Sequence, residues 1–295
     1  ALDKLAAAKK LVTSYFRDDK AEFVKRYFAG REKFLEYATT EQSFERIVDD
    51  LKNPIQEKIV AAKTDANILI LAGPGAGKTR VVAHRVAYLL RVERVPARSI
   101  LVLCFNRGAV QSLRKRIRDL VGPDMRRVTT STFHGLALRL TGRSLVPGTA
   151  SKRKEEIDYS QIIQDANALL RGEVESLGFE PDSSRDILVG RFSHILVDEY
   201  QDIDGDQYEL VSLLAGRTAR ENDLKLSILA VGDDDQNIYR FRGANVGFIR
   251  QFREDYQATV HYLVENYRSS ANIIEASNQF IVQNKDRMKT DHPIV

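Results

Sequence analysis

Short apolar runs recur along residues 51–295, and the segments between them carry apolar residues at helical spacing. Runs of this length are typical of strands that are buried on both faces, as in a parallel sheet covered by helices on each side. The alternation therefore predicts an α/β fold with a parallel sheet and helices on both faces. The predicted strands are residues 68–72, 100–105, 195–197, 228–231 and 260–264.

A glycine-rich segment, AGPGAGKT, occupies residues 72–79, where the first predicted strand ends and a helix-periodic segment begins. Small residues between a strand and a helix let backbone N–H groups surround a phosphate, as in a P-loop. Lys78 then supplies a positive charge, and Thr79 supplies a ligand for magnesium. A glycine-rich turn without a ligand is the alternative, which the flanking strand and helix disfavour. The predicted nucleotide ligands are Gly73, Gly75, Ala76, Gly77, Lys78 and Thr79.

Two carboxylates, Asp198 and Glu199, directly follow the predicted strand at residues 195–197. Beside a P-loop, Asp198 would hold magnesium directly or through water, and Glu199 would orient or deprotonate the attacking water. A solvated turn or a helix cap is the alternative for such a pair, and the P-loop favours the hydrolytic interpretation. Phosphoryl transfer depends mainly on positioning and charge neutralisation, so loss of Lys78 should abolish hydrolysis without unfolding the domain.

Seven sequence blocks occur in a fixed order between residues 51 and 280, and together they resemble the UvrD/Rep/PcrA family of superfamily 1A DNA helicases. They are NPIQ (53–56), AGPGAGKTR (72–80), LVLCFNRGAV (101–110), STFHGLALRL (131–140), ILVDEYQDID (195–204), VGDDDQNIYRFRGA (231–244) and ENYRSS (265–270). The resemblance implies a RecA-like P-loop NTPase fold that uses ATP and Mg²⁺. It also implies an ATP-dependent helicase or translocase that moves 3′ to 5′ on single-stranded DNA.

The same resemblance implies roles for individual residues. Gln56, Arg80 and Tyr267 match residues that hold adenine by hydrogen bonding, packing and stacking respectively. Gln236 and Arg268 match groups that touch the γ-phosphate. The residue pattern alone leaves two alternatives open, because Gln56 also fits a helix-capping position and Arg80 also fits a solvated helix position. The predicted catalytic residues are Lys78, Glu199, Gln236 and Arg268, with Thr79 and Asp198 as metal ligands.

Positions that match the single-stranded DNA path of the family are Phe105, His134, Tyr239, Phe241 and Arg242. Base–aromatic stacking contributes about 1–3 kcal/mol per base and tolerates any sequence, as a translocating motor requires. Core packing is the alternative for the aromatic residues, and we expect it for Phe133. The block at residues 231–244 would couple the γ-phosphate to DNA. Its three aspartates at residues 233–235 could cap the next helix, hold magnesium-bound water or bind the neighbouring arginines.

The domain organisation follows from where these patterns begin and end. Residues 1–50 are charged and helix-periodic without recognisable chemistry, so we expect a helical N-terminal extension and an ATP-binding domain at 51–295. Residues 145–191 are polar and mostly helical, and resemble a short inserted 1B subdomain. The chain starts without Met and ends soon after ENYRSS, which predicts a fragment without the second RecA-like domain. Such a fragment should hydrolyse ATP weakly, and the parent protein could carry an upstream domain.

Composition constrains the setting and the partners. Cys104 is the only cysteine, so no internal disulfide is possible, and we expect a reducing, cytoplasmic environment with Cys104 as a small core residue. Neither a zinc-type ligand set nor an apolar stretch of the ~20 residues that a membrane span requires is present in the sequence. The 45 basic and 41 acidic residues permit a polyanionic partner without proving one.

Two other functions fit part of the sequence. A P-loop NTPase acting as a switch or a kinase would explain AGPGAGKT and ILVDE, but not STFHG, YRFRG or NYRSS. A nucleotide-dependent module that binds DNA or protein, with a decayed ATPase, is the second alternative. The chemical residues of the P-loop and of the Asp-Glu pair are intact, which argues against decay. A junction of single- and double-stranded DNA is a further partner expected for the parent protein.

Overall fold

The computed structural model describes residues 2–27, 29, 41–142, 159–174, 191–216, 226–236, 245–284 and 287–295. The chain divides into two compact units, residues 1–44 and 45–295. The first unit contains helices α1 (Leu2–Arg17) and α2 (Lys20–Tyr27), so its described part is mostly helical. The domain boundary predicted at residue 50 stays a prediction, and the compact units separate six residues earlier. None of the described helices is long and apolar enough to span a lipid bilayer.

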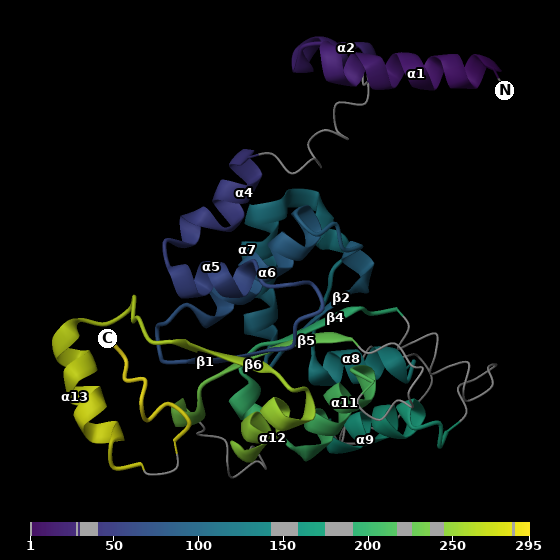
Figure 1. Cartoon of the computed structure of the whole chain (residues 1–295). Helices are drawn as coiled ribbons and strands as arrows, with labels where there is room; N and C mark the ends of the chain where they lie inside the picture. The colour runs from purple at the N-terminus through teal and green to yellow at the C-terminus, as the bar shows by residue number, and fades with distance from the viewer. Residues whose placement is uncertain are drawn as a thin grey trace. The chain divides into compact units, whose positions relative to one another are not determined.

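A six-stranded parallel sheet forms the centre of the second unit, with the strand order β3-β2-β4-β5-β1-β6 (Figure 1). The strands β1, β2, β4 and β5 are almost entirely buried, which explains why they are near-continuous apolar runs. All five predicted strands are present, and their observed bounds are β1 (Ile68–Ala72), β2 (Ile100–Cys104), β4 (His194–Val197), β5 (Ser227–Gly232) and β6 (Thr259–Leu263).

The strand β3 (Thr129–Thr132) was missed by the sequence analysis, because its sequence TTST contains no apolar residue. It lies at one edge of the sheet and pairs only with β2. Threonine is β-branched and suits a strand. The two inner residues, Thr130 and Ser131, are buried although they are polar. A search for apolar runs therefore finds the interior strands of this sheet and overlooks the polar edge strand β3.

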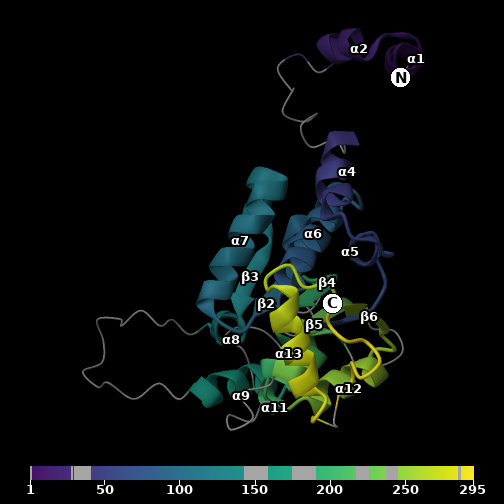
Figure 2. The same ribbon diagram turned by 90° about the vertical axis from the view of Figure 1, so that its left-hand side faces the viewer.

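Helices cover both faces of the sheet, as predicted (Figures 1 and 2). One face carries α5 (Pro54–Val60), α6 (Lys78–Arg91) and α7 (Arg107–Val121), and the other carries α8 (Phe133–Leu140), α9 (Tyr159–Leu170), α11 (Gly205–Leu214) and α12 (Gly247–Asp255). The remaining described α-helices are α4 (Glu41–Ile47) and α13 (Ala271–Ile281). Asn53 caps α5, because Asn53 Oδ1 accepts hydrogen bonds from the backbone N–H groups of Ile55 and Gln56.

The core beneath the second face includes both predicted and unexpected members. Phe133 is 1% exposed, which confirms it as a core residue. The helix α9 comes from the middle of the predicted insertion, yet its apolar residues Ile162, Ile163 and Ala166 belong to the same buried cluster as Phe133. The described part of the insertion therefore packs into the main core, beside α8 and α11. Its assignment as a separate 1B-like subdomain stays a prediction.

Cys104 is buried at the end of β2, which confirms it as a core residue. Burial, assisted by the nearby Asp198 carboxylate, raises the pKa of the Cys104 thiol to about 12. The thiolate is the reactive form, so we expect native protein at pH 8 to react with a disulfide reagent at least about 100-fold more slowly than a free cysteine. The rate should rise to that of a free cysteine in denaturant. Rapid reaction of the native protein would show that this end of β2 opens readily.

Candidate active site

The glycine-rich turn between β1 and α6 has the conformation that a phosphate-binding loop requires. Gly75 and Gly77 have φ angles of 72° and 85°, in the left-handed region that favours glycine. A Cβ on Gly75 would also lie 2.8 Å from Arg268 Cβ. No side chain caps the first turn of α6 among the described residues, so its N–H groups are available to an anion.

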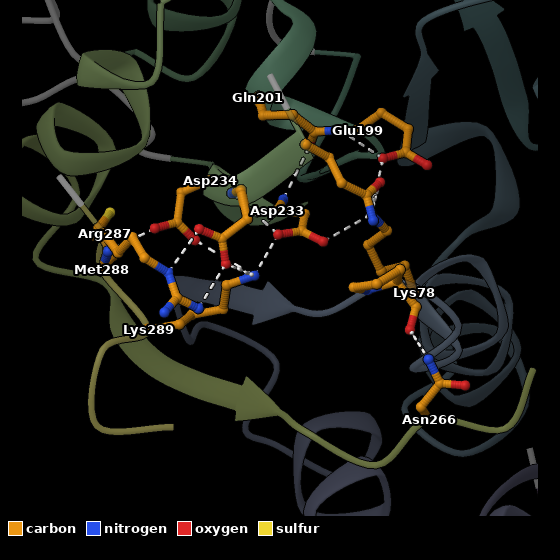
Figure 3. Close-up of polar contacts among 12 residues, drawn as sticks. Lys78, Glu199, Gln201, Asp233, Asp234, Asn266, Arg287, Met288 and Lys289 are labelled. Atoms are coloured by element: carbon orange, nitrogen blue, oxygen red, sulfur yellow. Dashed lines mark hydrogen bonds and ion pairs between the residues drawn. The ribbon is translucent and has the colours of Figure 1, made fainter. Parts of the chain in front are cut away.

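Lys78 lies at the start of α6 and faces groups from the carboxyl ends of two other strands (Figure 3). Its Nζ is 3.2 Å from Glu199 Oε2, after β4, and 3.9 Å from Asp233 Oδ2, after β5. Lys78 Nζ also donates a hydrogen bond of 3.3 Å to Gln236 Oε1. The fold thus brings Lys78, Glu199 and Gln236 together from segments that are more than 30 residues apart, as their predicted shared function requires.

Thr79 and Asp198 form a second pair beside Lys78. Thr79 Oγ1 donates a hydrogen bond of 3.2 Å to Asp198 Oδ2, and Asp198 is only 1% exposed. Burial, followed by repulsion from Glu199, raises the pKa of Asp198 to about 6. A buried carboxylate of this kind gains from a cation that restores its charged form, and hydroxyl and carboxylate oxygens are ligands suited to Mg²⁺. These two residues therefore fit a magnesium ion.

Glu199 has an unusual backbone conformation and a fixed side chain. Its φ of 56° places it in the left-handed region, which is uncommon for a residue with a Cβ and is often associated with functional sites. Gln201 Nε2 donates a hydrogen bond of 2.8 Å to Glu199 Oε2. At the other end of the same amide, Gln201 Oε1 accepts from the backbone N–H of Asp233 at 3.0 Å. Gln201 therefore connects the segment after β4 to the segment after β5 (Figure 3).

The residues predicted to hold adenine surround the other side of the glycine-rich turn. Gln56 is 1% exposed, and its Nε2 donates to Ala76 O at 3.2 Å, so its side chain contacts the turn instead of capping its own helix. Arg80 Nη2 donates to Asp50 O at 2.7 Å. Tyr267 is 56% exposed, and its hydroxyl accepts from Asn53 Nδ2 at 2.9 Å.

A cavity of about 520 Å³ opens between these groups. Its lining combines the glycine-rich turn with the charged and aromatic residues predicted for the nucleotide, and its size suits a small organic ligand. The lining residues are Gly75, Ala76, Gly77, Lys78, Thr79, Arg80, Arg116, Glu199, Tyr267 and Arg268. Most of the predicted phosphate, adenine and γ-phosphate residues thus share one cavity. Gly73, Gln56 and Gln236 are not among its lining residues, but Gln56 and Gln236 form hydrogen bonds to Ala76 and Lys78, which are.

Two residues at this cavity were missed by the sequence analysis. Arg116 lies on α7 within a run of basic residues, and nothing in the sequence separates it from its solvated neighbours. Asn266 precedes Tyr267, and its side chain holds the turn because Nδ2 donates to Pro74 O at 2.7 Å. Asn266 Oδ1 accepts from the backbone N–H of Arg268 at 2.8 Å. A turn-forming asparagine within ENYRSS was the available signal.

The residues predicted for the DNA path are only partly described. Phe105 is partly exposed directly after β2, and His134 is half-buried in the first turn of α8, directly after β3. Cys104 of β2 pairs with Thr132 of β3, so Phe105 and His134 follow adjacent strands at the same edge of the sheet. Burial lowers the pKa of His134. Tyr239, Phe241 and Arg242 lie outside the described residues.

The parallel sheet, the glycine-rich turn and the carboxylates after β4 define a P-loop NTPase fold with a RecA-like arrangement. The sequence model of the AAA domain family matches residues 56–242, more than half of the chain. The chain therefore belongs to the AAA domain family. Its sequence is also similar to those of bacterial DNA helicases.

Two of these relatives are ATP-dependent DNA helicase PcrA of Bacillus subtilis and DNA helicase II of Escherichia coli. The first is 31% identical in an alignment that covers 80% of this chain and 40% of the relative. The second is 29% identical in an alignment that covers 82% of this chain and 42% of the relative. A solved structure of Bacteroides sp Pif1 in complex with ADP-AlF4 aligns with 80% of this chain and 47% of its own, at 13% identity and a TM-score of 0.42. The chain spans about two fifths of the length of these curated relatives.

Proposed function

We propose that this chain is the ATP-binding half of a motor that uses ATP to move 3′ to 5′ along single-stranded DNA, as a helicase or translocase. The observation that carries the proposal is the meeting of Lys78, Asp198, Glu199 and Gln236 at the carboxyl ends of three adjacent strands. The relatives are named as ATP-dependent DNA helicases, which supports the choice of nucleotide and of polymer. The rest of the motor, including a second RecA-like domain, is proposed to lie in a longer parent protein.

The phosphate end of the site performs the chemistry in this proposal. Lys78 neutralises charge on the transferred phosphoryl group, and Gln236 and Arg268 contact the γ-phosphate. Thr79 and Asp198 hold Mg²⁺, which supplies charge stabilisation on the phosphate oxygens when bound. Glu199 orients or deprotonates the attacking water, and Gln201 holds its carboxylate in place. Without the second RecA-like domain, hydrolysis by this chain is expected to be slow.

The adenine end of the site fixes the base. Tyr267 presents an exposed ring beside the cavity and is proposed to stack on adenine, while Arg80 packs on the base. Gln56 Oε1 is buried without a hydrogen-bond donor among the described residues, so it is available to accept from an adenine amino group. A buried acceptor with no partner is costly, and a ligand would remove that cost.

The DNA path is proposed to run past the ends of β2 and β3. Phe105 and His134 would contact the strand there, followed by Tyr239, Phe241 and Arg242. Gln236 lies on the short 3₁₀ helix Asp234–Gln236 just before the last three, so a change at the γ-phosphate can reach the DNA over few residues. In the parent protein the same path would lead to a junction of single- and double-stranded DNA.

Binding of a labelled oligothymidine tests this proposal. We expect wild-type protein to bind at low salt and to lose affinity as salt rises, because contacts to phosphates release counterions. Phe105→Ala and Phe241→Ala should each weaken binding by ~1 kcal/mol or more, because each removes a stacking surface. Phe280→Ala, which removes an exposed phenylalanine from α13, should bind like the wild type.

The same protein should bind ADP, which is measured separately by titration. Binding of ADP without binding of the oligothymidine would contradict the motor function and favour a P-loop switch. Equal losses for Phe105→Ala and Phe280→Ala would contradict the position of the DNA path.

A further inference from the structure

A buried lysine near the C-terminal end of the described chain contacts all three aspartates of the segment after β5 (Figure 3). Lys289 is 2% exposed, and its Nζ forms an ion pair with Asp233 Oδ1. The same Nζ lies 3.5 Å from Asp234 Oδ1 and 3.2 Å from Asp235 Oδ2. Three roles were predicted for these aspartates from the sequence, and none of them involves Lys289.

Neighbouring groups complete the charge balance of this cluster. Arg287 binds Asp235 in a bidentate manner, with Nε and Nη2 at 2.8 and 2.9 Å from its two oxygens. The backbone N–H of Met288 donates a hydrogen bond to Asp234 Oδ2. Three carboxylates thus face two cations from residues 287–289, and Lys78 is the third cation at ion-pair distance. Buried charges are tolerated only when they are paired in this way.

The two carboxylate oxygens of Asp233 face two different lysines. Asp233 Oδ1 faces Lys289, while Oδ2 lies 3.9 Å from Lys78 Nζ. Oδ2 is buried and accepts no hydrogen bond from the described residues. Among the described residues, Lys78 would therefore be the one cation left within ion-pair distance of Asp233 if Lys289 lost its charge. A carboxylate that is 0% exposed would then compete strongly for the lysine of the glycine-rich turn.

The segment that carries Lys289 also contacts the glycine-rich turn. A Cβ added to Gly73 would lie 2.7 Å from Ile294 Cδ1, so Ile294 packs directly on the turn. The backbone N–H of Asn266 donates to Val295 O at 2.8 Å, and Asn266 in turn holds Pro74. Residues 287–295 therefore contact both the segment after β5 and the turn before α6, which fixes Lys289 relative to both.

We propose that Lys289 is a positioning residue of the nucleotide site. By binding Asp233 Oδ1, it weakens the attraction of this carboxylate for Lys78, whose Nζ lies 3.9 Å from Asp233 Oδ2. The Lys78 ammonium is then more readily available to nucleotide phosphates. The inference rests on the proposed function, because it requires that Lys78 bind phosphate. It extends that function by making residues 287–295, which contact the glycine-rich turn at Gly73, part of the site.

A charge-balanced double variant tests this inference. Fluorescent ADP and a non-hydrolysable ATP analogue are titrated into the wild type, Lys289→Met, Lys289→Arg, and the double variant Asp233→Asn with Lys289→Met. Removing one partner of a buried charge pair has large effects, so we expect Lys289→Met to weaken binding of both nucleotides by about 10-fold or more. Lys289→Arg keeps the charge and should stay within about threefold of the wild type. The double variant should recover most of the loss, because residue 233 then carries no charge that could hold Lys78.

Thermal unfolding without nucleotide separates a positioning role from a structural one. If the role of Lys289 were only structural, Lys289→Met would lower the midpoint of thermal unfolding, and the double variant would bind nucleotide no better than Lys289→Met does. That result would overturn the inference. Unchanged affinity in Lys289→Met would also overturn it. If Lys289→Met does not fold, the nucleotide affinities of the double variant and of Lys289→Arg are compared with that of the wild type, and these comparisons test the inference. Failure of the wild type to bind either nucleotide would instead contradict the proposed function itself.

Discussion

Lys78→Ala is expected to weaken binding of ADP and of a non-hydrolysable ATP analogue by about 100-fold or more. Lys78 is the cation of the glycine-rich turn, and its side chain is only 10% exposed between Glu199 and Asp233. Charge-assisted contacts to phosphate are stronger than neutral hydrogen bonds, and a desolvated site strengthens them further. The loss also leaves two carboxylates facing the incoming phosphates without an intervening positive charge. Isothermal titration measures the affinities directly.

The control for this variant is Lys115→Ala, which removes an exposed lysine from α7. It changes the net charge by the same amount, so it corrects for any long-range electrostatic effect on nucleotide binding. We expect it to bind like the wild type. Far-ultraviolet circular dichroism should show the same helix content in both variants. If Lys78→Ala bound ADP as well as Lys115→Ala does, the glycine-rich turn would not be the phosphate site.

Glu199→Gln should separate binding from chemistry. We expect the rate of ATP hydrolysis to fall by about 100-fold or more, because general base catalysis contributes ~10²–10⁴-fold. Affinity for the non-hydrolysable ATP analogue should stay the same or increase, because the change removes a negative charge near the phosphates. Single-turnover hydrolysis of radiolabelled ATP detects slow reaction in this chain. An unchanged rate would show that Glu199 takes no part in activating water.

The matched control is Glu209→Gln on α11, where the carboxylate pairs with Arg171 and lies away from the cavity. Any general consequence of losing one carboxylate would appear there as well. We expect Glu209→Gln to hydrolyse ATP at the wild-type rate. A fall of similar size in both variants would indicate loss of folded protein, which active-site titration with the ATP analogue would reveal.

Local signals in the sequence predicted most of the sheet and the phosphate end of the site. The strands β1, β2, β4 and β5 lie in the interior of the sheet, so burial makes them apolar, and the run of β6 is apolar as well. The turn at residues 72–79 is one continuous segment, so its function can be predicted from its own residues. The strand β3 was not predicted, because its sequence TTST is polar and contains no apolar run.

The contacts that were missed join residues far apart in the chain. Lys289 and Asp233 are separated by more than 50 residues, and a lone lysine among ordinary polar residues carries no sign that it will be buried. Arg116 shares its helix with other basic residues, and only the packing of α7 beside α6 turns it toward the cavity. The sequence predicted which chemical groups the site contains. The structure was needed to show which other residues hold those groups in position.

The side chain of Gln201 directly links the segments that follow two different strands. Its amide is a rigid, planar group, and one end holds the Glu199 carboxylate while the other holds the backbone of Asp233. The two ends are chemically different, a donor and an acceptor, so the link has a direction that neither a carboxylate nor an apolar side chain reproduces. The distance between the two attachment points is therefore set by covalent geometry. We therefore expect a displacement of the chain after β5 to shift the Glu199 carboxylate as well, because one side chain joins the two.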